Sequence, residues 1–74
     1  MEEKKMREIL LKENKEFRGA FDQHQKLEKK LAKFQAKNFL SDEEKWEERQ
    51  LKKEKLLLKD KMYYLMAEYK KSLP

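Results

Sequence analysis

Several residue types that stabilise other kinds of fold are missing from this chain of 74 residues. Cysteine is absent, which excludes disulfides, thiolate metal sites and thiol nucleophiles. Valine and threonine are also absent and Ile9 is the only isoleucine, so the β-branched residues favoured in strands are almost lacking. A single glycine, Gly19, and a single proline, Pro74, leave few places at which a helix is interrupted. We therefore predict an all-α fold.

Long apolar runs are absent as well. Runs such as residues 9–11 and 56–58 fall far short of the roughly 20 residues that span a bilayer. The first residues, Met1 to Glu3, lack the basic region and apolar core of a signal peptide. We expect a soluble, cytoplasmic protein that does not associate with membranes.

Charged residues are abundant. They make up 47% of the chain against 38% hydrophobic residues, and the net charge is +5. This balance approaches that of disordered chains, but the apolar residues recur at helical spacing, which favours a folded protein. The length suits one small domain, and we assign residues 1–74 to it.

The first half of the chain carries an amphipathic helix, which we place at about residues 15–37. Its seam advances in steps of three and four residues and contains Phe17, Ala20, His24, Leu27, Leu31 and Phe34. Asn14 precedes it as a candidate N-cap. Met6 and Leu10 continue the same spacing backwards, so residues 4–12 form either a short separate helix or the beginning of one helix over residues 4–37.

A turn at about residues 38–41 separates this helix from a second one at about residues 42–71. Ser41 and Glu44 have the spacing of a capping box, which marks the start of the second helix. Reversal of the chain at the turn brings the two apolar seams together. We predict an antiparallel, coiled-coil-like helical hairpin whose core consists of Leu27, Leu31, Phe34, Leu51, Leu58, Met62 and Leu65.

The second helix has more apolar residues than this core requires. The surplus residues are Trp46, Leu56, Leu57, Tyr63 and Tyr64. Burial in a two-helix hairpin leaves a thin margin over the entropy lost on ordering the chain. We therefore predict a homodimer in which two hairpins form a four-helix bundle with the surplus residues in the second interface, or else an unidentified protein partner. In the turn, Phe39 and Leu40 are expected to fold back near Trp46.

Two stretches are similar to a known family. ENKEF (residues 13–17) with FDQHQKL (residues 21–27) resembles the first helix of the small bacterial YdcH-like proteins, and LKKEKLLLKDKM (residues 51–62) resembles their signature LKKxKLxLKDEI. That family is of unknown function, so the resemblance implies a cytoplasmic bacterial helical hairpin and no activity. The family often has proline at the position of Lys15.

The chain offers no catalytic, cofactor-binding or metal-binding set. His24 has neither a second histidine nor a cysteine with which to share a metal, and Ser41 and Ser72 belong to a cap and a tail. We interpret His24 as a packed polar residue that is hydrogen-bonded to Tyr64, Tyr69 or a glutamate. A register or pH switch at this histidine is the alternative.

These features predict a non-catalytic module for protein–protein interaction or a structural role. The alternative is weak, non-specific binding of nucleic acid through a lysine-rich face of the first helix, made of Lys26, Lys29, Lys30, Lys33 and Lys37. Contacts with phosphates need only such a surface. Arginine is scarce, however, and the chain has no motif that reads bases, so the interaction module is favoured.

Overall fold

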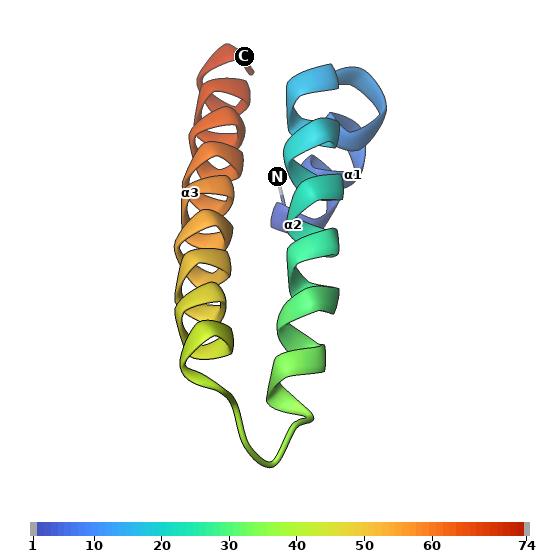
Figure 1. The fold of residues 1–74 in the computed structure, drawn as a ribbon. Helices are drawn as coiled ribbons and strands as arrows, with labels where there is room; N and C mark the ends of the chain where they lie inside the picture. The colour runs from blue at the N-terminus through green and yellow to red at the C-terminus, as the bar shows by residue number, and fades with distance from the viewer. Residues whose placement is uncertain (1, 74) are drawn as a thin grey trace.

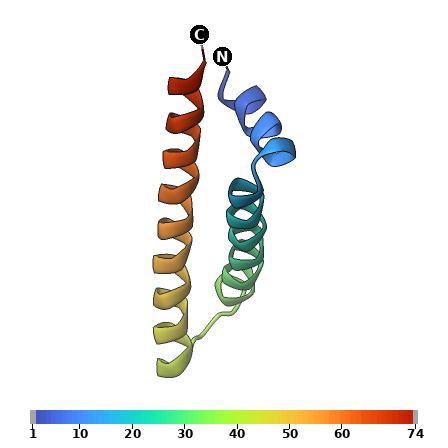
Figure 2. The same ribbon diagram turned by 90° about the horizontal axis from the view of Figure 1, so that it is seen from above.

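A computed structural model of the protein describes residues 2–73 and contains three helices: α1 (Glu3–Glu13), α2 (Lys15–Gln35) and α3 (Asp42–Ser72). The two long helices lie side by side and antiparallel, and α1 folds back next to the first turns of α2 (Figures 1 and 2). The described part of the chain contains no strand. The predicted all-α helical hairpin is therefore confirmed, and its dimensions are 52 × 19 × 16 Å.

The chain breaks between α1 and α2 at Asn14. Its backbone is extended, and its side chain accepts a hydrogen bond of 3.0 Å from the backbone N–H of Phe17. Arg18 reaches back across the break and donates to the carbonyl oxygens of Leu11 and Lys12, at 2.8 and 3.0 Å. Residues 4–37 are thus two helices. The break needs no proline after the cap, because these side chains satisfy backbone groups at both helix ends.

The core consists of two clusters along the hairpin. The cluster near the turn has Leu27, Leu31 and Leu51 buried, with Phe34 and Leu58 packed against them. The cluster at the other end has Met6, Leu10 and Phe17 buried, and the partly buried residues around them are Leu11, Met62, Leu65, Met66 and Tyr69. Every core residue predicted from the two seams lies in one of these clusters. Met6 and Leu10 of α1 are also buried, although the predicted core did not contain them.

The connection between α2 and α3 is held at both ends. Ser41 and Glu44 form the predicted capping box, with hydrogen bonds of 3.1 and 3.2 Å between the backbone N–H of each and the side chain of the other. The Lys37 ammonium donates to the Glu44 carboxylate and lies 5.9 Å from the centre of the Phe34 ring. Between these contacts Phe39 points into solvent with 82% of its surface exposed. The prediction that Phe39 folds back near the hairpin end is wrong, because the contacts on either side of the connection leave its side chain directed outward.

The pKa of Glu44 is lowered from its ordinary value of 4.5. The hydrogen bond from Lys37 is the main cause, and the backbone N–H of Ser41 adds to it. Since the carboxyl group has a lower pKa in the folded state, the pair stabilises the hairpin above pH 4.5 and loses this effect as the pH falls through the lowered pKa.

The packing of α1 against the hairpin is tested by replacing Phe17, whose side chain is fully buried between the helices. We expect Phe17→Ala to lower the free energy of unfolding by about 3–5 kcal/mol, because it leaves a cavity in a small core. Urea unfolding followed by circular dichroism measures the change. The matched control is Phe39→Ala, which removes the same atoms from an exposed site and should change stability by less than about 0.5 kcal/mol. Equal urea midpoints for the two variants would contradict this packing.

Candidate interaction surface

The side of α3 that faces away from α2 carries a row of large apolar side chains. Core residues such as Leu58 and Leu65 face α2, and a residue two positions away on a helix points in nearly the opposite direction. This spacing places the surplus apolar residues on what we call the outer face of α3. Their exposed fractions lie between 57% and 64%: Trp46, Leu56, Leu57 and Tyr64 lie on this face, and Tyr63 lies at its edge, where it also lines the cleft between the three helices.

The row is long enough to serve as an interface. From Trp46 to Tyr64 it extends over about 27 Å at 1.5 Å per residue. Large apolar residues that gather on one exposed face commonly mark a surface that binds another protein. Tryptophan and tyrosine are also the residues that most often dominate the binding energy of protein interfaces.

Charged side chains lie between the apolar residues of the outer face. Arg49, Lys53 and Asp60 are exposed there, and within residues 2–73 none of them takes part in an ion pair. The predicted interaction residues were the apolar ones alone. The same helical spacing that places Trp46 and Tyr64 on this face also places the three charged residues on it, so the signal was present in the sequence.

Trp46 has an acidic environment. A shallow hollow at the start of α3 is lined by the indole together with Asp42, Glu43 and Glu47. An exposed aromatic ring surrounded by carboxylates suits a partner that presents lysine or arginine.

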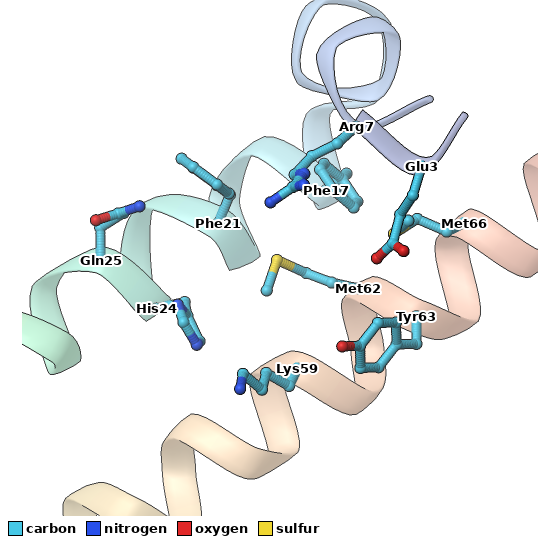
Figure 3. A pocket seen from close by; sticks show the side chains of 10 residues that line it. All are labelled: Glu3, Arg7, Phe17, Phe21, His24, Gln25, Lys59, Met62, Tyr63 and Met66. Carbon is cyan, nitrogen blue, oxygen red and sulfur yellow. The ribbon is translucent and has the colours of Figure 1, made fainter. Parts of the chain in front are cut away.

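A second concave site lies between the three helices, around His24 (Figure 3). It is a cleft of about 170 Å³ lined by Glu3 and Arg7 of α1, Phe17, Phe21, His24 and Gln25 of α2, and Lys59, Met62, Tyr63 and Met66 of α3. Figure 3 shows Arg7 directed into the space between α2 and α3, with His24 and Lys59 at its other end. Phe17, Met62 and Met66 belong both to the cleft and to the core cluster at the open end of the hairpin.

His24 is packed without a hydrogen bond at its inner nitrogen. Its Nε2 is buried and has no hydrogen-bond partner within the described residues, and it lies 3.7 Å from Glu28 Oε1. The predicted hydrogen bond to Tyr64, Tyr69 or a glutamate is therefore wrong. Tyr64 is on the outer face of α3, and Tyr69 packs in the cluster at the far end of the hairpin, so neither tyrosine hydroxyl bonds to the histidine.

Residues 2–73 contain no group of three or more histidine, cysteine, aspartate or glutamate side chains placed to hold a metal ion. Within the same residues, none of the helices combines the length and the apolar character that a membrane crossing requires.

The lysines of α2 form an exposed arc. Of the five lysines predicted to bind nucleic acid, Lys26, Lys29, Lys30 and Lys33 make no ion pair in the part of the chain that the structure describes. Lys37, the last of the predicted set, is exposed but pairs with Glu44 across the turn. Four of the five lysines therefore form no ion pair within residues 2–73, and the fifth, Lys37, pairs with Glu44 across the turn.

These features define a small helical-hairpin protein with an apolar stripe on the outside of its longest helix. Comparison with protein families matches residues 17–66 to DUF465, described as a protein of unknown function. The chain belongs to this family. The match runs from Phe17 in α2 to Met66 in α3 and does not extend to α1. Neither the search of curated proteins nor the search of solved structures found a match.

The unpaired nitrogen of His24 has a measurable consequence for stability. We expect His24→Leu to raise the free energy of unfolding by about 1 kcal/mol, because it removes a buried polar atom that has no partner and adds apolar contact with Phe17 and Met62. Urea unfolding at pH 8 measures this. Gln23→Leu, a polar-to-apolar change at an exposed position of the same helix, is the control and should have little effect. A loss of stability in His24→Leu would show that the imidazole is satisfied.

Proposed function

We propose that this protein is a non-catalytic helical hairpin that binds protein through the outer face of α3. The observation that carries the proposal is the position of the five surplus apolar residues. They remain exposed although the inner face of the same helix is already occupied by α2 and α1. A helix that is apolar on both sides needs a second partner.

The energetics support such a partner. Complete burial of one large apolar side chain contributes about 1.5–3 kcal/mol, so burial of even part of this row would favour association. Isolated exposed apolar residues are normal, but here they repeat on one face over several helical turns.

The family relationship is compatible with this proposal. DUF465 is described only as a family of unknown function. The resemblance of residues 51–62 to the YdcH-like signature likewise implies a hairpin without an assigned activity. We infer that the two descriptions apply to the same kind of protein, in which the hairpin itself is the functional unit.

Site-specific photo-crosslinking in the native cell tests the proposed surface. A photoreactive amino acid at Tyr64 should give a discrete protein adduct, identified by mass spectrometry, because this side chain lies within the outer face. The same probe at Ala32, which is exposed on α2, is the matched control. Adding Leu57→Lys to the Tyr64 probe should abolish the adduct and leave the helical circular dichroism unchanged. No adduct from Tyr64, or the same adducts from Ala32, would contradict the proposal.

A second candidate function is weak binding of nucleic acid by the arc of free lysines on α2. The observation in its favour is that Lys26, Lys29, Lys30 and Lys33 are exposed without an ion-pair partner within residues 2–73. Binding through phosphates alone is independent of base sequence and falls steeply with salt, with a logarithmic slope of about −0.9 for each phosphate contact on duplex DNA.

Fluorescence anisotropy with labelled DNA and RNA across a salt series tests this candidate. We expect replacement of the four lysines by glutamine to abolish any binding seen at low salt, and Leu57→Lys to leave it intact because that residue lies on the opposite helix. An absence of binding by the wild-type protein at low salt would exclude the candidate. Binding that survives the fourfold replacement would assign it to another surface.

A further inference from the structure

The residues on the outer face of α3 follow an ordered pattern along the helix. They recur at intervals of three or four positions on either side of an adjacent pair of leucines, and every one of them is exposed. We call this set the outer row. Its members are Asp42, Trp46, Arg49, Lys53, Leu56, Leu57, Asp60, Tyr64, Ala67 and Lys71.

We propose that the outer face of α3 binds a second copy of this chain, with the two α3 helices antiparallel and centred on Leu56 and Leu57. The inference rests on the proposed function and names the partner for the same surface. Its basis is charge complementarity. When the outer rows of two copies run antiparallel and are aligned at their midpoints, each residue lies opposite a residue of the second copy with complementary charge or size.

The centre of this arrangement is apolar and is flanked by ion pairs. Leu56 of one copy lies against Leu57 of the other, and the symmetry repeats this contact. In the next layer Lys53 faces Asp60 of the second copy, and Asp60 faces Lys53. Two oppositely charged pairs therefore enclose four leucines, as the flanking charges of antiparallel helices commonly do.

The outer layers are complementary too. Arg49 faces Tyr64 of the second copy, a cation beside an aromatic ring. Trp46 faces Ala67, so the largest side chain of the row meets the smallest.

At the ends, Asp42 faces Lys71 of the second copy. This contact brings the acidic first turn of one α3 next to the basic last turn of the other, and it gives the carboxylates around Trp46 their counter-charges.

Three other arrangements oppose like charges. A parallel, in-register pair would place Lys53 on Lys53 and Asp60 on Asp60. An antiparallel pair shifted by one heptad in one direction would place Asp60 on itself and Arg49 on Lys71, and a shift in the other direction would place Lys53 on itself. Like charges across an interface are unfavourable, so the charges of the outer row disfavour these three arrangements.

The charged members of the outer row are free to pair between copies. Within residues 2–73, Asp42, Arg49, Lys53 and Asp60 form no ion pair. Lys71 is engaged only by Glu68 on the preceding turn, at 3.8 Å, with 78% of its side chain exposed.

Charge exchange tests the register. Sedimentation equilibrium should show a dimer for the wild-type chain. Lys53→Asp and Asp60→Lys should each weaken dimerisation by at least about tenfold, because each opposes like charges in two symmetric layers. The double variant with both substitutions should restore the wild-type dissociation constant. Lys61→Asp, at an exposed position outside the row, is the control for net charge and should have little effect.

Disulfide crosslinking tests the direction independently of the charge variants. The chain has no cysteine, so single cysteines are specific probes. A mixture of Trp46→Cys and Ala67→Cys chains should form a mixed disulfide, while neither variant should crosslink with itself. In the proposed dimer, the two copies of position 67 are about 32 Å apart at 1.5 Å per residue. Self-crosslinking of Ala67→Cys would indicate a parallel pair and overturn the inference.

The remaining outcomes separate this inference from the proposed function. A wild-type chain that is monomeric at all concentrations, with a Tyr64 crosslink to a different protein, overturns self-association and retains the interaction surface. A dimer in which the two charge substitutions have no effect, or in which the double variant fails to recover, overturns the register. A monomer that also gives no crosslink from Tyr64 overturns both.

Discussion

Contact between the apolar seams of α2 and α3 is the interaction on which the rest of the structure depends. Leu27 and Leu31 meet Leu51 and Leu58 close to the turn, and this contact fixes which face of each helix is turned inward. All other surfaces follow from that choice. The lysines of α2 and the apolar row of α3 lie outside because helical spacing places them away from the seam.

The hairpin is not packed evenly along its length. Two helices cannot enclose a side chain as large as phenylalanine from all directions, and at the open end α1 provides the third wall over Phe17. Next to that cluster lies the cleft that contains His24 (Figure 3). The two ends of the protein are thus stabilised differently, one by a capped turn with a lysine–glutamate pair and the other by an additional helix.

The outer face of α3 combines apolar and charged side chains in a way that serves specificity as well as affinity. The leucines and aromatic residues provide area that is favourable to bury. The unpaired Lys53 and Asp60 add a constraint, because they are satisfied only by a partner that presents the opposite charges at the same spacing. A second copy of the same helix meets this condition when it runs in the opposite direction.

Much of this protein is determined by sequence alone. The absence of β-branched residues and the recurrence of apolar residues at helical spacing are sufficient to predict an all-α hairpin, and Ser41 with Glu44 marks the start of α3. The exposure of Trp46, Leu57 and Tyr64 also follows, since one helix face can pack against only one seam. These properties are local, because they depend on residues within a few turns of one another.

The features that depend on contacts between distant segments of the chain were decided only by the tertiary structure. The spacing of Met6 and Leu10 is equally compatible with one long helix or two, and the extended backbone of Asn14 and the reach of Arg18 across the break distinguish them. Likewise, His24 lies on the predicted seam, but whether its nitrogen finds a partner depends on which side chains the opposite helix presents at that level. Periodicity specifies the direction in which a side chain points, whereas its contacts are specified by the segment that packs against it.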